Sequence, residues 1–293
     1  MTQEQFLQTL APFPTKANLN PVILYEEDCG QYIRQKIHFQ AEADEVIPAY
    51  LLLPKDLKGK VPAIYCHHQH DTNWELGKSE AIGLIGNPDL AYARELAEQG
   101  YITLAPDAIA FEERQNNIGG QAGNYFELAR RLVNGENLLA KTLFDISVGI
   151  DFLVSRPEVD ADRIGFIGHS YGGRMALFAP AFDRRIKVSV SNCGCVNYKD
   201  SIEKEIGLQL EFCVPGILKY GDVEDVVRLA EPCSMMVLAT KEDKFSLGAA
   251  RLYEYARDAF QKGTFLVKEY EGGHAFTKAM RADAYAFLEK ILR

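Results

Sequence analysis

The sequence has no excess of basic residues and no long apolar run. Its 293 residues include 32 lysines and arginines against 41 aspartates and glutamates, which gives a formal net charge of −9. An acidic chain of this kind is not expected to bind nucleic acid or anionic membranes. No apolar stretch approaches the length of a membrane span, and residues 1–7 lack the basic and apolar regions of a signal peptide. We therefore expect a cytoplasmic protein without nucleic-acid or membrane partners.

Cysteines are few and irregularly spaced, which is unlike a disulfide framework. The six lie at positions 29, 66, 193, 195, 213 and 233. Two of them, Cys66 and Cys233, stand in or beside apolar segments, so we expect buried free thiols in a reducing compartment. Cys193 and Cys195 form a C-x-C motif that could be redox active, but a motif of this kind after a strand is weak evidence for redox activity.

Repeats, low-complexity tracts and linkers are also missing, so residues 1–293 are expected to form a single domain. Hydrophobic residues make up 47% of the chain and charged residues 25%, which are ordinary globular values. Residues 1–55 are interpreted as an N-terminal extension, a short helix and then a proline-rich segment, followed by two antiparallel strands at 32–39 and 47–53.

Strand and helix patterns alternate along the rest of the chain. Helices are predicted over 90–99, 136–155 and 276–292, from apolar positions that recur at helical spacing. Short apolar segments between them predict further strands, at 63–66, 101–105, 163–167, 187–191, 235–240 and 265–270. This alternation predicts an α/β protein with a mostly parallel, twisted sheet of about eight strands and helices on both faces.

A serine stands between the strand at 163–167 and a run of helix formers at 173–179. It is Ser170, the centre of the pentapeptide Gly-His-Ser-Tyr-Gly, and Gly168 and Gly172 flank it two residues away on each side. This pattern is typical of a nucleophile elbow, a sharp strand-to-helix turn in which a Cβ at the glycine positions would collide with neighbouring backbone. The sequence therefore predicts an exposed serine nucleophile above the sheet.

A base and an acid for this serine follow later in the chain, each just after a predicted strand. His274 follows the strand at 265–270, and it is the best candidate for the group that takes the serine proton, because an imidazole titrates near neutrality. Two carboxylates, Glu242 and Asp243, follow the strand at 233–240, and either could orient the imidazole.

The oxyanion of an acyl transfer needs two hydrogen-bond donors. One is expected to be the backbone N–H of Tyr171, the residue after the serine. The other should come from the loop after the strand at 61–66, where the Gln69 N–H is the best candidate, with His68 and His70 as its neighbours. Loss of one such donor typically costs about 10²–10³ in turnover.

The same loop, His67 to Asp71, could instead bind a metal, because it contains a His-x-His pair followed by an aspartate. Thr72 and Asn73 stand where a metallo-hydrolase motif requires further ligands, and few other histidines remain in the chain. We therefore expect no metal, and we expect the polar side chains of His68 and His70 to line the pocket floor, where they could contact the substrate, or to orient the loop.

Two segments are expected to shape the substrate pocket, 112–135 and 192–232, because both connections are long. Arg114 lies in the first and could pair with a substrate carboxylate. Arg174 could do the same but is more typical of a helix surface or a salt bridge. Asp107 is interpreted as a structural turn carboxylate.

Together these segments resemble the dienelactone-hydrolase and acetyl-xylan-esterase-like branch of the α/β-hydrolases, over nearly the whole chain. The chain departs from the family in two places. It has a serine where dienelactone hydrolases proper have a cysteine, and its oxyanion loop begins His-His where His-Gly is usual. The matching segments are 47–54, the loop at His67, 105–107, Glu113–Arg114, 160–172, 214–222 and 273–276.

The resemblance implies a catalytic triad of Ser170, Asp243 and His274, with Asp243 rather than its neighbour as the acid. It also implies a cofactor-free serine ester hydrolase that acts on a small-molecule ester through an acyl-enzyme. An acyltransferase with the same triad and a catalytically silent binding protein are the alternatives. The chain could also form a homo-oligomer.

Overall fold

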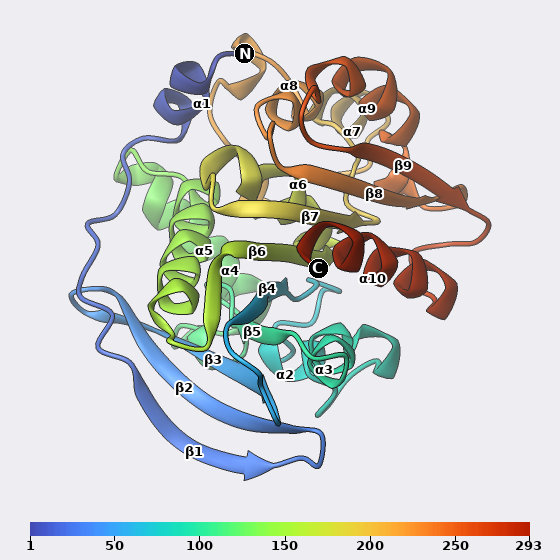
Figure 1. Ribbon diagram of the computed structural model, residues 1–293. Coiled ribbons are helices and arrows are strands. Elements are labelled where there is room, and N and C mark those ends of the chain that lie inside the picture. The colour runs from blue at the N-terminus through green and yellow to red at the C-terminus, as the bar shows by residue number, and fades with distance from the viewer.

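A computed structural model describes residues 1–293 as one nine-stranded sheet with helices on both faces (Figure 1). The strands follow one another across the sheet in the order β1-β2-β3-β5-β4-β6-β7-β8-β9. Their bounds are β1 Val22–Asp28, β2 Tyr32–Glu42, β3 Glu45–Pro54, β4 Val61–His67, β5 Ile102–Pro106, β6 Val159–His169, β7 Ile186–Asn192, β8 Ser234–Thr240 and β9 Phe265–Tyr270.

The sheet is antiparallel at its N-terminal edge and parallel elsewhere. β1, β2, β3 and β5 pair antiparallel, and every pair from β5 through β4 to β9 is parallel. The mostly parallel sheet predicted from the sequence is therefore present. The additional strand is β1, where the sequence predicts only a proline-rich extension. All seven of its residues are exposed, so β1 has no alternation of buried and exposed positions that would indicate a strand.

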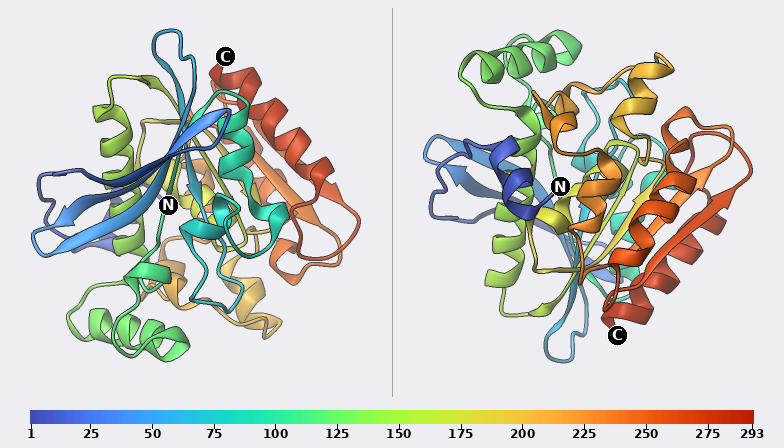
Figure 2. Two further views of the ribbon diagram at one scale, coloured as in Figure 1. Left: turned by 90° about the horizontal axis from the view of Figure 1, so that it is seen from below. Right: turned by 90° about the horizontal axis from the view of Figure 1, so that it is seen from above.

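Helices cover the two faces of the sheet (Figure 2). Their buried side chains form two separate hydrophobic cores. One core holds α1 (Gln3–Leu10), α5 (Leu138–Ser155), α6 (Tyr171–Phe182), α8 (Val223–Arg228) and α9 (Ala249–Ala256). The other holds α2 (Lys78–Ala81), α3 (Tyr92–Glu98) and α10 (Lys278–Leu292). No helix in the structure combines the length and the apolar character that crossing a membrane requires.

Local sequence explains where the long helix α5 begins and ends. The Asn137 side chain accepts a hydrogen bond of 2.8 Å from the Ala140 N–H, so it caps the first turn. The helix stops at Ser155, two residues before Pro157, because the residue before a proline disfavours helical geometry. Gly149 faces the Tyr65 ring, where a side chain would not fit, and α5 thereby packs closely on the sheet.

The two long connections fold into short helices at the carboxyl end of the sheet. Segment 112–135 contains α4 (Gly120–Val133), which projects from the body of the protein (Figure 2). Segment 192–232 contains α7 (Tyr198–Glu203), α8 and two short 3-10 turns at Leu210–Phe212 and Ile217–Lys219. The sequence predicts both segments as pocket walls, but it does not reveal the α4 helix.

Candidate active site

Ser170 occupies the turn between β6 and α6 in a strained conformation. Its backbone dihedrals are φ 56° and ψ −112°, a region that residues with a side chain rarely adopt. The Ser170 N–H donates a hydrogen bond of 2.8 Å to the Asn192 carbonyl at the end of β7, which holds the turn against the neighbouring strand. The serine stands at the N-terminus of α6, where the helix dipole favours negative charge.

The glycines around Ser170 are required by close backbone approaches. A Cβ at Gly168 would lie 2.3 Å from the Gly172 carbonyl carbon, and one at Gly172 would lie 2.1 Å from the His67 carbonyl oxygen. A Cβ at Gly173 would lie 2.2 Å from the Asn192 carbonyl oxygen. The collision predicted for the elbow glycines is therefore present in the structure, and it packs α6 onto the loop after β4.

Asp243 and His274 are brought together from the ends of two neighbouring strands, β8 and β9. His274 Nδ1 lies 3.0 Å from Asp243 Oδ2. The Asp243 carboxylate also accepts hydrogen bonds from the Phe245 N–H at 3.0 Å and the Ser246 hydroxyl at 2.7 Å. Three donors thus fix the carboxylate in one orientation, and Asp243 rather than Glu242 is the acid that faces the imidazole.

The surroundings of Asp243 and His274 favour the charged form of both side chains. Burial favours the neutral form of Asp243, yet its hydrogen bonds with His274, Ser246 and Phe245 lower the pKa of its carboxyl. Burial likewise opposes protonation of His274, but Asp243 and the neighbouring Cys193 raise the pKa of its imidazole to about 9. The imidazolium is thus stabilised where it would form during proton transfer.

His274 also lies beside the elbow, because its ring centroid is 4.7 Å from that of His169. The Ser170 hydroxyl makes no hydrogen bond to the imidazole in this structure. Catalytic hydrogen bonds are often long without substrate and tighten only in the substrate complex. The three residues predicted as a triad therefore lie at the carboxyl ends of β6, β8 and β9, where open α/β sheets place their sites.

The two backbone N–H groups predicted as oxyanion donors make no hydrogen bond within the protein. The Tyr171 N–H is the first of α6, and neither it nor the Gln69 N–H donates to any group of the protein. The Gln69 side chain donates a hydrogen bond of 2.9 Å to the Glu80 carboxylate, and this bond anchors the loop. The Tyr92 hydroxyl donates to the His67 carbonyl and fixes the same loop from the other side.

His68 does not line the pocket, so its prediction as a substrate contact is wrong, and it has the loop-orienting role that was the alternative. Its Nδ1 donates to the Gln69 carbonyl at 2.6 Å, and its Nε2 accepts from the Ala108 N–H at 3.0 Å. Burial lowers the pKa of His68 to about 4, so the ring is neutral and structural. The same applies to His67, whose Nδ1 faces the His68 carbonyl, and this arrangement leaves the loop histidines unsuited to a shared metal.

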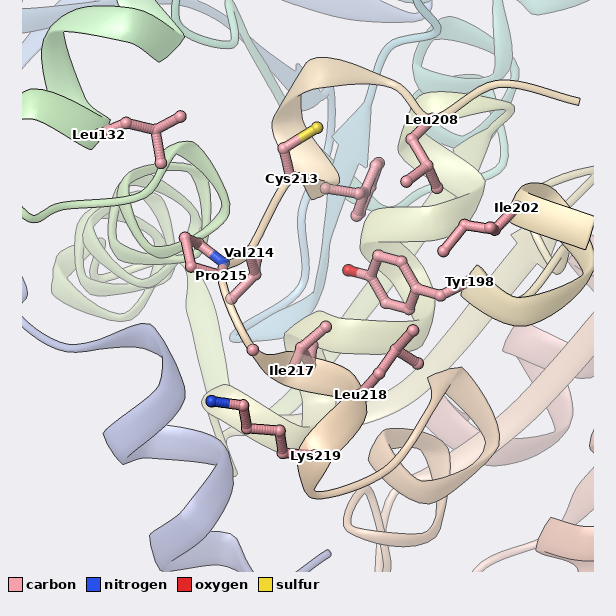
Figure 3. Close-up of a pocket in the computed structure, with 12 residues that line it drawn as sticks. Leu132, Tyr198, Ile202, Leu208, Cys213, Val214, Pro215, Ile217, Leu218 and Lys219 are labelled. Atoms are coloured by element: carbon pink, nitrogen blue, oxygen red, sulfur yellow. The ribbon is translucent and has the colours of Figure 1, made fainter. Parts of the chain in front are cut away.

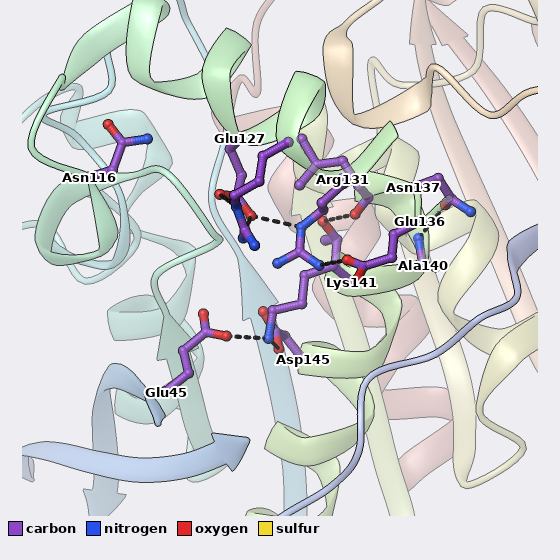
Figure 4. A network of polar contacts seen from close by, with 12 residues as sticks. Glu45, Asn116, Glu127, Arg131, Glu136, Asn137, Ala140, Lys141 and Asp145 are labelled. Carbon is purple, nitrogen blue, oxygen red and sulfur yellow. Dashed lines mark hydrogen bonds and ion pairs between the residues drawn. The ribbon is translucent and has the colours of Figure 1, made fainter. Parts of the chain in front are cut away.

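Arg114 is also unavailable to a substrate, and this prediction is wrong. Its guanidinium bonds Glu45 and lies 2.8 Å from Asp145, and its side chain is 4% exposed. The fully buried Lys141 forms ion pairs with the same carboxylates, at 2.6 Å to Glu45 and 2.8 Å to Asp145 (Figure 4). The sequence did not show that these distant charges meet beneath α4, where they anchor the hairpin of β2 and β3 to α5.

Arg174 differs from its prediction as well, since it is neither on a helix surface nor in a salt bridge. Its side chain is buried and donates a hydrogen bond of 2.7 Å to the Val196 carbonyl. The guanidinium carbon lies 4.7 Å from the centroid of the Phe212 ring. It therefore fixes the start of segment 192–232. Asp107 is structural, as predicted: its carboxylate is buried and lies 2.7 Å from Lys78 Nζ.

A cleft of about 560 Å³ opens beside the paired Asp243 and His274. Phe245 connects the two, because it lines the cleft and its ring centroid is 5.2 Å from that of His274. His70 also lines the cleft, as the sequence predicts. The remaining lining residues are Thr72, Trp74, Gln121, Ala122, Asn124, Tyr125, Ile206, Gly207, Leu208, Gln209 and Leu210.

An apolar groove of about 510 Å³ adjoins this cleft through their common residue Leu208 (Figure 3). Its walls come from the end of α4 and from segment 198–219, including Tyr198, Ile202 and Phe212. The two long connections predicted to shape the pocket therefore supply most of both surfaces.

Some residues of the site were missed by sequence reasoning. Ser246 and Phe245 follow Asp243 directly, and an aspartate capping a short turn is a recognisable signal for such bonds. Cys193 has no such signal. It follows β7, and its thiol lies within 4.8 Å of the ligand atoms of Asp243 and His274.

Comparisons with known proteins identify the family and the fold of the chain. The model of the Abhydrolase family matches residues 3–198. The hydrolase-like protein YtaP of Bacillus subtilis (strain 168) is 28% identical over 99% of this chain and 98% of its own length.

Solved structures share the fold at lower identity. The glucuronoyl esterase from Solibacter usitatus is 15% identical, with a TM-score of 0.73 over 98% of this chain and 91% of its own. Acetyl xylan esterase 1 from Thermoanaerobacterium sp. JW/SL YS485 is also 15% identical, with a TM-score of 0.66 over 100% and 99% of the two chains. The nine-stranded sheet, the elbow and the family match together place this chain in the Abhydrolase family of α/β-hydrolases.

Proposed function

We propose that the protein is a serine carboxylic-ester hydrolase. The observation that carries the proposal is the Asp243–His274 pair, with Nδ1 and Oδ2 3.0 Å apart, at the sheet edge where Ser170 occupies a strained elbow. A carboxylate paired with an imidazole beside such a serine is the arrangement that activates a hydroxyl for acyl transfer. The similarity in fold to proteins named as esterases supports an ester as the substrate.

The chemistry follows from these positions. Ser170 Oγ attacks the ester carbonyl carbon while His274 takes the hydroxyl proton, and the oxyanion accepts from the Tyr171 and Gln69 N–H groups. The bond to the alcohol then breaks as His274 returns the proton to the leaving oxygen. A water molecule, deprotonated by the same imidazole, then attacks the acyl carbon, and the bond to Ser170 Oγ breaks as His274 returns the proton to that oxygen and the acid leaves. Asp243 keeps the imidazole in the required orientation.

The cleft supports an uncharged small-molecule ester as the substrate. Its lining contains no Asp, Glu, Lys or Arg, whereas it offers aromatic rings and neutral amides. A substrate carboxylate would lose its hydration there without gaining a cation, which is costly. Aromatic faces and amides would instead hold a neutral sugar or aromatic ester. A cytoplasmic location remains a prediction from the sequence.

Labelling with a fluorophosphonate tests the serine directly. The wild-type chain should take up the probe at Ser170 and hydrolyse short acyl esters, and Ser170→Ala should lose both, with turnover reduced about 10⁴–10⁶-fold. A folded wild-type chain that resists the probe would instead be a silent scaffold. Adding an alcohol acceptor separates hydrolysis from acyl transfer, because a transferase would form a new ester rather than free acid.

A further inference from the structure

Three side chains with metal-binding atoms meet next to the elbow, and the proposed hydrolysis uses only two of them. The Cys193 thiol, the Asp243 carboxylate and the His274 imidazole have one ligand atom each, all within 4.8 Å of one another. They come from separate connections, after β7, β8 and β9. No lysine or arginine forms an ion pair with Asp243 or His274, so the imidazole of His274 is the only basic side chain paired with the Asp243 carboxylate.

The backbone fixes Cys193 in this position. Cys193 has φ 51°, a left-handed conformation that is rare for a residue with a side chain. Its N–H donates a hydrogen bond of 2.9 Å to the Leu238 carbonyl of β8, and its thiol lies 3.5 Å from the Ala275 carbonyl. The thiol is therefore held toward the His274 loop from a rigid strand end.

The ligand set suits zinc and cadmium rather than magnesium or calcium. Thiolate and imidazole are preferred by Zn²⁺, which binds them at about 2.3 Å and 2.0–2.1 Å. These bond lengths require ligand atoms roughly 3–4 Å apart, so a modest contraction of the cluster is enough. The His274 loop has room to move, because nothing lies within 4 Å of the Cβ position of Gly272 or Gly273.

The other carboxylate cluster in the protein is not a candidate metal site. Asp107, Glu112 and Glu113 also lie within 4.8 Å of one another, but the buried ammonium of Lys78 already occupies their centre at 2.6–2.7 Å. The cluster at Cys193 is the one without such a cation.

We propose that Cys193, Asp243 and His274 form a zinc-binding site that reversibly switches off Ser170. Binding releases two protons, one from the thiol and one from His274 Nδ1, the nitrogen that faces Asp243, and the imidazole then coordinates through that nitrogen. The single proton of that ring then resides on Nε2, which can no longer accept the serine proton. Metal binding depends on the cluster alone, while the loss of activity rests on the proposed function.

Cadmium absorption tests binding without using activity. Ser170→Ala protein titrated with Cd²⁺ should develop a thiolate-to-metal absorption band at one equivalent, and Zn²⁺ should displace it. Adding Cys193→Ser should weaken binding at least about tenfold, since even the loss of an outer-shell partner typically costs about 10–100-fold in metal affinity. Cys195→Ser is the matched control, because that thiol bonds the Ser246 carbonyl instead and should keep the band.

His274→Ala provides a second variant if Cys193→Ser fails to fold, because the His274 side chain is 29% exposed. It should also weaken binding at least about tenfold. In the wild-type chain, Zn²⁺ should abolish hydrolysis and a chelator should restore it. A band that persists in both variants, or no band in the Ser170→Ala protein, would overturn the site. An inactive metal-free wild-type chain would count against the proposed function and leave the binding result standing.

Discussion

His274 Nδ1 lies 3.0 Å from Asp243 Oδ2, with the carboxylate 2% exposed and the imidazole 29% exposed. The buried Asp243 is thus held by the protein, and the more exposed His274 lies next to Phe245, which lines the cleft. Because Phe245 and Ser246 also donate to Asp243, the carboxylate cannot rotate away from the ring. This asymmetry suits a base that must exchange protons with a substrate while its own orientation stays fixed.

The pH dependence of hydrolysis should be displaced to the alkaline side. His274 accepts the serine proton only when its imidazole is neutral, and Asp243 and Cys193 raise the pKa of that imidazole to about 9. Below this value the protonated fraction is inactive, so kcat/KM should rise with pH and level off only above it. A pH–rate profile of kcat/KM at constant ionic strength measures the midpoint.

The Asp243→Asn variant shows whether the carboxylate causes that displacement. An amide cannot stabilise the imidazolium, so the midpoint should move to lower pH while kcat falls about 10⁴-fold. Glu242→Gln is the control, because Glu242 is exposed and adjacent but does not face the ring. An unchanged midpoint in Asp243→Asn, or equal losses in the two variants, would contradict the assignment of the acid.

Gly172→Ala should destabilise the protein, whereas Gly273→Ala should not. A Cβ at Gly172 would lie 2.1 Å from the His67 carbonyl and 2.9 Å from that of His68, and backbone cannot yield cheaply. We expect a loss of about 1–3 kcal/mol or more in the free energy of unfolding. Nothing lies within 4 Å of the corresponding position at Gly273, so its change should stay within about 0.5 kcal/mol.

Urea unfolding followed by the fluorescence of Trp74, the single tryptophan, measures both variants. Activity adds a second criterion. The His67 carbonyl belongs to the oxyanion loop, so Gly172→Ala should also reduce kcat in the fraction that folds. A stable and fully active Gly172→Ala protein would contradict the close approach of α6 to this loop.

Lys78 should be one of the most sensitive charged residues of the fold. Its fully buried ammonium lies 2.6–2.7 Å from carboxylate oxygens of Asp107, Glu112 and Glu113. Lys78→Met leaves the fully buried Asp107 carboxylate without a cation, and removal of one partner from a buried pair typically costs about 3–5 kcal/mol. Lys36→Met is the control, since its contact with Glu113 is partly exposed and should be worth at most about 1 kcal/mol.

The pH dependence of the Lys78→Met defect gives an independent check. Burial raises the pKa of Asp107 to about 7 even with Lys78 present. Without the ammonium the carboxylates protonate more readily, so the unfolding free energy should be lower at about pH 8 than at about pH 5. A defect of equal size at both values would mean that lost packing, rather than unpaired charge, causes it.

Much of the fold could be predicted because most of its central strands are buried and its helices are periodic. The strands β4, β5, β7 and β8 are short and mostly buried, and α5 repeats apolar positions at helical spacing, so each has a local signal. β1 has none, because both of its faces are exposed at the edge of the sheet. α4 was missed for a similar reason, since only five of its 14 residues are buried.

The residues of the site likewise divide into those with a local signal in the sequence and those without one. Ser170 could be found because glycines and flanking elements mark the elbow locally, and Tyr171 follows from it. Contacts between distant segments leave no such mark. Arg114 was misassigned because its partners Glu45 and Asp145 lie far away in the sequence. The position of Cys193 beside His274 depends on the register of β7 against β8, which only the assembled sheet defines.

Tyr125 should contribute to substrate binding, although it lies on the projecting helix α4. It lines the cleft and is 63% exposed, so its ring is free to pack against a substrate. The next residue, Phe126, is 49% exposed but does not line the cleft, and it provides a control of equal size.

Tyr125→Ala should raise KM for an uncharged aromatic or sugar ester and leave kcat nearly unchanged. An aromatic contact is worth about 0.5–1.5 kcal/mol, which corresponds to roughly 2- to 12-fold in KM. Phe126→Ala should leave both constants unchanged. Steady-state kinetics on an ester and on its carboxylate-bearing analogue complete the test, because a cleft without cations should disfavour the anion in every variant. If the anionic ester is preferred, or if Phe126→Ala raises KM as much as Tyr125→Ala does, the substrate lies elsewhere.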